Sequence, residues 1–141
     1  MPLWDDIAAQ ISQVTDEKFV VDEVRRLGGG CINETCCVTS ADQRYFVKLN
    51  VSNSLQMFEA EAAGLEEIHK TNTLRVPQPI CCDQDDEKSW LVLEYLEMNG
   101  SHHAKQAELG AGLASMHRIH AEQFGWVRNN TIGLTPQIND V

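Results

Sequence analysis

The sequence predicts an α+β domain in which a five-stranded antiparallel sheet carries a helix packed on one face. Apolar residues at helical and at extended spacing follow one another in the order helix, three strands, helix, two strands, helix. Consecutive strands favour antiparallel pairing, whereas a doubly wound parallel sheet would alternate strands with helices. The chain has 141 residues, and 43% of them are hydrophobic, which is sufficient to bury a core.

The N-terminal half supplies one helix and three strands. Helical spacing of apolar residues over 3–14 predicts a short amphipathic helix. The imperfectly alternating segment Phe19–Leu27 predicts a strand that runs into a glycine turn at 28–30. The next two predicted strands and the hairpin turn between them are Glu34–Ser40, Arg44–Leu49 and 41–43.

The C-terminal half begins with a helix over Leu55–Lys70, for which the polar residues 52–54 offer an N-cap. Ile80–Asp83 and the strongly apolar Ser89–Leu96 are predicted strands. A further helix is predicted from about His103 to Ala121, and the residues after it carry turn signals.

The charge of the chain limits its function. Eleven basic and 21 acidic residues give a net charge of −10, which argues against binding to nucleic acid or to anionic lipid. No apolar run approaches the roughly 20 residues of a membrane span. The acidic N-terminus does not resemble a signal peptide, so the expected location is the cytoplasm.

The cysteines form a poor disulfide framework. They number five and include two adjacent pairs, at Cys31, Cys36, Cys37, Cys81 and Cys82. No C-x-x-C pattern occurs, so no zinc site is predicted, and reduced thiols of a cytosolic protein are expected.

Four features carry chemistry. Gly28–Gly30 could bring backbone N–H groups close to phosphate oxygens, because glycine has no Cβ in the way. Lys48 ends an apolar strand and could place its ammonium over phosphates, and Glu59 or Glu61 in the next helix could hold it. The strand end 93–96 could offer backbone groups to a purine edge.

Each feature alone has a simpler alternative: an ordinary hairpin turn, a surface lysine, solvated glutamates, and a core strand that leaves the sheet. Glu59 and Glu61 lie on different faces of the helix, so only one of them is expected to reach Lys48. Taken in order, the four features match the ATP-binding lobe of protein-kinase-like enzymes.

The sequence resembles the fructosamine kinase (ketosamine kinase) family over nearly its whole length. The segments that carry the resemblance are Leu27–Asn33, Tyr45–Lys48, Met57–Leu65, Leu91–Leu96, Leu113–Arg118, Phe124–Trp126, Asn130–Gly133 and Thr135–Gln137. The resemblance implies a protein-kinase-like N-terminal lobe at 1–97, followed at 98–141 by a connector and the first helix of a C-terminal lobe. It also implies ATP-dependent phosphorylation of the sugar of fructosamines or ribulosamines on glycated amines, which is either protein deglycation or repair of low-molecular-weight Amadori products.

Site residues follow from the same resemblance. The loop expected to cover the phosphates is Gly28, Gly29, Gly30, Cys31, Ile32 and Asn33. Lys48 is expected to contact the α- and β-phosphates, and Glu61, which lies in the matching helix segment, to pair with it. The residues expected at the adenine are Glu94, Tyr95 and Leu96.

Catalytic residues are not found among these 141. The family's base lies in a His-Gly-Asp…Asn loop and its Mg²⁺ ligands lie in the C-terminal lobe, but no His-x-Asp occurs here. We therefore expect a truncated chain that binds ATP weakly, is inactive alone, exposes apolar surface on the helix at 103–121 and self-associates. The alternatives are a non-catalytic interaction or regulatory module with the same fold, and a small binding domain without a nucleotide role.

Cys31 supports a separate hypothesis. A thiol in a phosphate loop near Lys48 could form an intermolecular disulfide that controls nucleotide entry. The alternative is a small residue that the turn tolerates.

Overall fold

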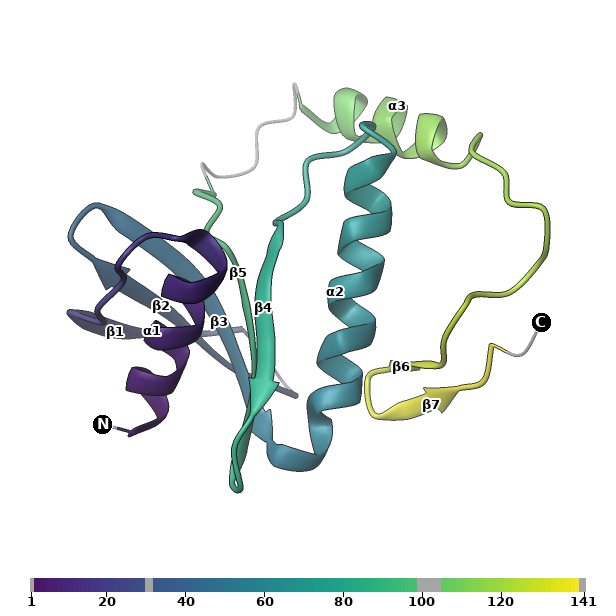
Figure 1. Cartoon of the computed structure of the whole chain (residues 1–141). Coiled ribbons are helices and arrows are strands. Elements are labelled where there is room, and N and C mark those ends of the chain that lie inside the picture. The colour runs from purple at the N-terminus through teal and green to yellow at the C-terminus, as the bar shows by residue number, and fades with distance from the viewer. Residues whose placement is uncertain (1, 30–31, 99–104, 140–141) are drawn as a thin grey trace.

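The computed structural model describes residues 2–29, 32–98 and 105–139 (Figure 1). The helices are α1 (Pro2–Thr15), the 3₁₀ turn η1 (Ser52–Ser54), α2 (Leu55–Lys70) and α3 (Gln106–Met116). The strands are β1 (Glu23–Leu27), β2 (Glu34–Ser40), β3 (Gln43–Val51), β4 (Pro79–Gln84), β5 (Lys88–Glu94), β6 (Asn130–Ile132) and β7 (Thr135–Gln137).

Five strands form one antiparallel sheet in the order β1-β2-β3-β5-β4. β3 lies at its centre, where Lys48 is opposite Thr35 of β2 and Leu91 of β5. β6 and β7 form a separate two-stranded hairpin. The predicted class, an α+β fold with a five-stranded antiparallel sheet and a packed helix, is confirmed.

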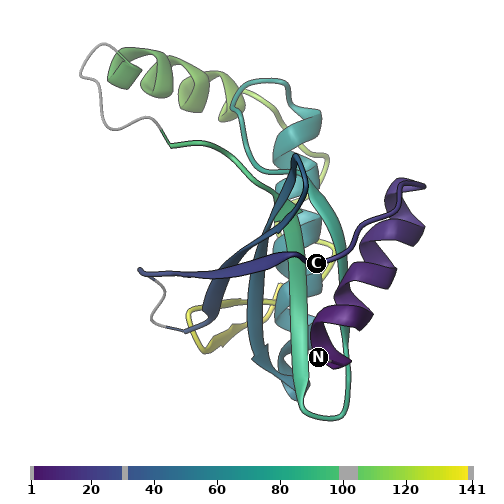
Figure 2. The same cartoon turned by 90° about the vertical axis from the view of Figure 1, so that its left-hand side faces the viewer.

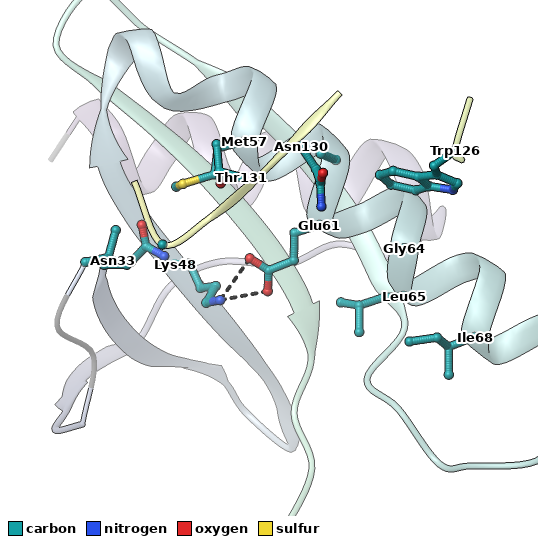
Figure 3. Close-up of a pocket in the computed structure, with 13 residues that line it drawn as sticks. Asn33, Lys48, Met57, Glu61, Gly64, Leu65, Ile68, Trp126, Asn130 and Thr131 are labelled. Carbon is teal, nitrogen blue, oxygen red and sulfur yellow. Dashed lines mark hydrogen bonds and ion pairs between the residues drawn. The ribbon is translucent and has the colours of Figure 1, made fainter. Parts of the chain in front are cut away.

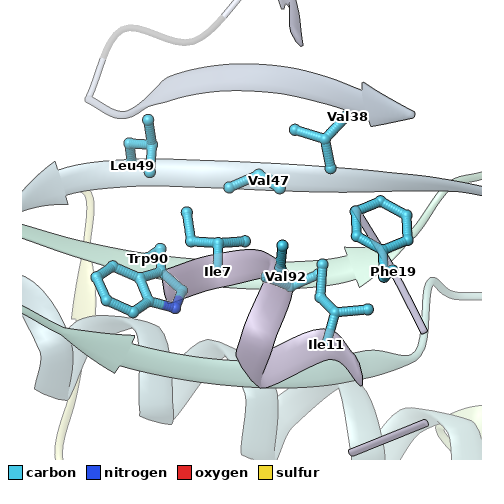
Figure 4. Packing of buried hydrophobic residues seen from close by; sticks show 9 residues of the cluster. Ile7, Ile11, Phe19, Val38, Val47, Leu49, Trp90 and Val92 are labelled. Atoms are coloured by element: carbon cyan, nitrogen blue, oxygen red, sulfur yellow. The ribbon is translucent and has the colours of Figure 1, made fainter. Parts of the chain in front are cut away.

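The two faces of the sheet carry different helices. α1 covers one face, where Ile7 and Ile11 pack on Val47 and Val92 (Figure 4). α2 covers the opposite face (Figure 2). There Phe58 packs on Leu91 and Leu93 of β5. Because side chains alternate along a strand, each central strand contributes to both layers.

α2 begins without a side-chain cap. Ser54 occupies the N-cap position, as expected, but its side chain makes no capping hydrogen bond, and the turn η1 leads into the helix instead. His69 and Lys70 lie in the last turn, where positive charge suits the helix dipole. Asn72, with a φ of 54°, then turns the chain toward β4.

The predicted first strand is too long. β1 begins at Glu23, four residues later than expected, because Phe19 turns into the core beside α1. Its N–H donates to Ser12 Oγ at 2.9 Å, and the N–H of Val20 donates to Ser40 Oγ at 3.2 Å. At Phe19 and Val20, the hydroxyls of Ser12 and Ser40 therefore take the place of backbone acceptors from a neighbouring strand.

The C-terminal part also differs from expectation. β5 ends at Glu94 rather than at Leu96, and α3 ends at Met116 rather than at Ala121. The β6–β7 hairpin was not predicted, since its strands have three residues each and Pro136 is one of them. The predicted helix start at His103 lies outside the described residues.

α3 exposes apolar surface, as expected. Leu109 is 61% exposed and Leu113 is 41% exposed, and no residue of this helix is buried. Figure 1 shows α3 crossing the C-terminal end of α2. Whether 1–97 and 98–141 belong to different lobes stays a prediction, as does self-association.

Candidate functional site

Lys48 and Glu61 form an ion pair between the sheet and α2. Lys48 Nζ lies 2.7 Å from Oε1 and 2.9 Å from Oε2 of Glu61, so the carboxylate accepts with both oxygens (Figure 3). The side chains are 22% and 31% exposed. β3 directs Lys48 to this side because its neighbours Val47 and Leu49 are buried under α1.

The structure distinguishes between the two candidate glutamates. Glu61 reaches Lys48, whereas Glu59 accepts from Arg128 Nη2 at 3.1 Å. Residues two apart on a helix diverge by about 200° around its axis, so one carboxylate faces the sheet lysine and the other faces away from it.

The glycine turn joins β1 to β2. Gly29 has a φ of 108°, a conformation that side-chain-bearing residues rarely adopt, and the space around the α-carbons of Gly28 and Gly29 is open. Thr35 Oγ1 donates to the carbonyl of Leu27 at 3.0 Å and closes the base of the turn. Gly30 and Cys31 lie outside the described residues.

The far side of the turn is fixed to β3. Asn50 Nδ2 donates to Asn33 Oδ1 at 2.7 Å and to the carbonyl of Ile32 at 3.3 Å. These bonds hold Ile32 and Asn33 at the cavity that Lys48 also lines. The predicted role of the loop over phosphates stays a prediction.

Two cavities meet at this wall. One, of about 610 Å³, lies beside the glycine turn and is lined by Leu27, Gly28, Gly29, Ile32, Asn33, Thr35, Phe46 and Lys48. The other, of about 440 Å³, lies along α2 and shares Ile32, Asn33 and Lys48 with the first. Glu61, Gly64, Trp126 and Asn130 are among its remaining lining residues (Figure 3).

The expected adenine contacts are not gathered with the rest. Glu94, Tyr95 and Leu96 do not line the cavity beside the glycine turn. Glu94 accepts from Arg75 Nη2 at 2.5 Å, and its N–H donates to the carbonyl of Gln78. The Arg44 guanidinium lies over the Tyr95 ring, 5.0 Å from its centroid.

Residues of the C-terminal segment approach the site, and sequence reasoning gave them no role. Trp126, Asn130, Thr131 and Gly133 line the cavity along α2. Arg128 binds Glu59, 69 positions away in sequence. The available signal was the resemblance in Phe124–Trp126 and Asn130–Gly133, which identified these segments without saying what they touch.

The described cysteines are free thiols. Burial is the main cause that raises the pKa of Cys36 and of Cys82, and it raises the pKa of Cys81 to about 12. Their thiolate forms are scarce at neutral pH, which suits structural rather than reactive roles. The Cys31 hypothesis lies outside the described residues and stays a hypothesis.

The part of the chain that the structure describes contains no cluster of three His, Cys, Asp or Glu side chains able to hold a metal. Among those same residues, no helix has the length and apolarity to cross a membrane.

The site suits a polyanion that carries an apolar group. Lys48 and the backbone of the glycine turn offer positive potential, while Leu27 and Phe46 offer apolar surface in the same cavity. A strand lysine held by a helix glutamate beside a glycine turn is the arrangement of the ATP-binding N-terminal lobe of protein-kinase-like enzymes.

Comparison with known proteins gives the family. The family model described as fructosamine kinase matches residues 3–141, and the chain belongs to this family. A Synechocystis protein named a probable ketoamine kinase is 47% identical over 137 residues, which are 96% of this chain and 46% of that protein. The chloroplastic protein-ribulosamine 3-kinase of Arabidopsis thaliana is 40% identical over 84% of this chain and 37% of its own length.

Solved structures agree on the fold. The crystal structure of a Haemophilus somnus protein described as a fructosamine-3-kinase superposes with a TM-score of 0.90 at 24% identity, over 98% of this chain and 49% of that one. A similarly described protein from Thermobifida fusca gives 0.72 at 28% identity, over 96% and 46%. The chain spans about half the length or less of these relatives.

Proposed function

We propose that this chain is the ATP-binding portion of a kinase that transfers a phosphoryl group to a sugar hydroxyl of a glycated amine. The observation that carries the proposal is the two-oxygen Lys48–Glu61 ion pair, placed at the wall that two cavities share beside a glycine turn. Membership of the fructosamine kinase family supports the acceptor class.

Each residue has a role that follows from its chemistry. The Lys48 ammonium binds α- and β-phosphate oxygens, because it is a cation at the edge of the cavity next to the glycine turn. Glu61 keeps that ammonium in place when no nucleotide is bound, through the ion pair with Lys48. The turn at 28–33 supplies backbone N–H groups to the phosphates, and Leu27 and Phe46 pack against the base.

In this proposal the backbone at Glu94–Leu96 meets the adenine edge, although these residues do not line the cavity beside the glycine turn. The half-buried Glu94 carboxylate accepts from Arg75 and from the N–H of Gln78, and the Glu94 N–H donates to the Gln78 carbonyl, so the backbone of Glu94 is held beside β4. That rigidity would lower the entropic cost of recognising a purine.

Magnesium is expected with this chemistry, and the described residues do not fit a magnesium site. Glu61 is already bound to Lys48, and no cluster of metal ligands accompanies it in the described ranges. The 141 residues also lack a His-x-Asp loop, so we propose that they bind nucleotide weakly and do not turn over alone.

The test is phosphoryl transfer by the protein as its gene encodes it. ATP is supplied with a free fructosamine or a free ribulosamine, and phosphorus NMR detects the sugar phosphate. Lys48→Met should lower kcat/KM at least 100-fold, because it removes the cation that orients the phosphates. Lys18→Met, at an exposed lysine between α1 and β1, is the matched control and should stay within twofold of wild type.

Lys48→Met activity within threefold of wild type would overturn the assignment of Lys48. Absence of transfer to either acceptor in the wild type, with ATP bound, would instead favour a non-catalytic module.

A further inference from the structure

Residues 124–139 form a strap along α2. The chain passes the C-terminal end of α2 and then runs back toward the N-terminal end of that helix, where the β6–β7 hairpin lies (Figure 1). β6 contacts α2 directly. The strap lies on the side of α2 that does not pack on the sheet, so the helix is held between two layers.

Trp126 provides the first anchor. Its Nε1 donates to Glu67 Oε2 at 2.6 Å. Its ring lies over Gly64, where a Cβ would meet the ring edge at 4.0 Å, an ordinary van der Waals distance (Figure 3). The indole therefore reaches the helix backbone with no side chain between them.

Arg128 provides the second anchor, about two helical turns away. Its Nη2 lies 3.1 Å from Glu59 Oε2, and its Nε is buried without a hydrogen-bond partner. Glu59 and Glu67 are eight residues apart, which is about 12 Å along the helix axis. Contacts at two heights limit the tilt of a helix, and contacts at two angles limit its rotation.

Asn139 closes the strap on itself. Its Nδ2 donates to the carbonyl of Arg128 at 3.1 Å and to Asn130 Oδ1 at 2.7 Å, while its N–H donates to Asn129 Oδ1. The strap is thus a hydrogen-bonded unit rather than a loose tail, and it can resist movement of α2.

Glu61 faces Lys48 of the sheet and lines the same cavity as Trp126 of the strap. The side chains of the Lys48–Glu61 pair are 22% and 31% exposed, and those of the Arg128–Glu59 pair are 34% and 42% exposed. Exposed ion pairs contribute only about 0–1 kcal/mol each, so neither pair fixes the helix alone.

Phe58 is the largest α2 side chain that is fully buried. Met57, Ala62 and Leu65 pack on the same cluster but are only partly buried. The rotation that turns Glu61 toward Lys48 therefore depends on several modest contacts, to which those of the strap add.

We propose that the strap sets the rotation of α2, and that Trp126 and Arg128 are positioning residues that act on phosphoryl transfer through Glu61. This inference rests on the proposed function for its kinetic consequence, but the contacts that carry it are independent of that function. Loss of either anchor should let α2 turn and separate Glu61 from Lys48.

The first test is a double-mutant comparison in the protein as its gene encodes it. Arg128→Met should lower kcat about tenfold with little change in the KM for the sugar acceptor. In a Glu61→Ala background the same substitution should change kcat less than twofold, because its target is already gone. Trp126→Phe keeps the ring and loses the N–H, so its effect should be smaller than that of Trp126→Ala.

Arg118→Met is the matched control, since this exposed arginine lies on the connection between α3 and the strap. It should leave kcat within twofold. An equal loss from Arg128→Met in both backgrounds, or no loss in either, would overturn the proposal.

The second test does not depend on activity. Hydrogen exchange of the α2 amides should accelerate at least fivefold in Arg128→Met and stay unchanged in Arg118→Met, while β5 stays protected in both. Faster exchange without any kinase activity would reject the proposed function and keep the strap. Unchanged exchange of α2 would reject the strap, whatever the activity.

Discussion

The two faces of the central sheet are built differently. Among the described residues, the cluster on the α1 face contains nine buried residues, whereas the cluster on the α2 face contains three: Phe58, Leu91 and Leu93. The α2 face carries instead the Lys48–Glu61 ion pair and the two cavities that meet there.

A single strand serves both faces. Along β3, Val47 and Leu49 point to the α1 face, while Phe46 and Lys48 point to the α2 face. The alternation separates a layer that stabilises the fold from a layer that binds and positions. Fewer apolar side chains are buried under α2 than under α1, which leaves room for a ligand. In our proposal the polar contacts of the strap add to the stability of α2 on this face.

The strongest way to break this comparison is to remove the main apolar anchor of α2. Phe58→Ala should lower the free energy of unfolding by about 3–5 kcal/mol, through lost transfer energy and the cavity left behind. Urea denaturation, monitored by tryptophan fluorescence, measures this decrease in the free energy of unfolding. A change below about 1 kcal/mol would mean that Phe58 is not the main apolar anchor of α2 on the sheet, contrary to our account.

Adjacent cysteines sharpen the comparison, because β4 directs Cys81 to the α1 face and Cys82 to the α2 face. Burial raises the pKa of Cys81 to about 12, so about one in ten thousand of its thiols is ionised at pH 8. A free thiol is about a quarter ionised at this pH.

Iodoacetamide at pH 8, followed by peptide mass spectrometry, should therefore label Cys81 at least a hundredfold more slowly than free cysteine. The rate should rise about tenfold per pH unit up to the pKa, because only the thiolate reacts. Labelling of Cys81 before Cys82 would contradict the tighter packing of the α1 face.

A smaller effect separates two glycines of α3. At Gly112 a Cβ would lie 2.5 Å from Leu74 Cδ2 and 2.8 Å from the carbonyl of Thr73, whereas nothing lies within 4 Å at Gly110. Gly112→Ala should cost about 1–3 kcal/mol by overpacking. Gly110→Ala should stabilise by about 0.5–1 kcal/mol, since alanine favours a helix interior.

Thermal denaturation of the two variants gives the comparison directly. Equal melting temperatures would show that α3 does not rest on the connection at Thr73 and Leu74.

Local sequence patterns predicted the sheet well. The apolar alternation in β3 and β5 and the helical spacing in α1 and α2 depend on which residues become buried, and that information is present in each segment. The choice of Glu61 over Glu59 needed the family resemblance, and the structure joins Glu61 to Lys48.

Features that depend on distant partners were not predictable. The sequence around Phe19 resembles the start of a strand, but the Phe19 N–H donates to Ser12 Oγ and the ring packs in the cluster on the α1 face. The Arg128–Glu59 bond joins residues 69 positions apart, and nothing near either residue signals the other. The short β6 and β7 strands lie below the length at which alternation is readable.

The most direct test of the division between the faces compares Ile11→Ala with Lys48→Met, with unfolding free energy and kcat/KM per folded molecule measured on both. Ile11→Ala should cost about 2–5 kcal/mol and leave activity within twofold, because Ile11 is fully buried on the α1 face. Lys48→Met should change stability by under about 1 kcal/mol, as expected of a partly exposed pair, and lower activity at least 100-fold. If the two variants lose stability and activity in the same proportion, the faces are not functionally separate and the account is wrong.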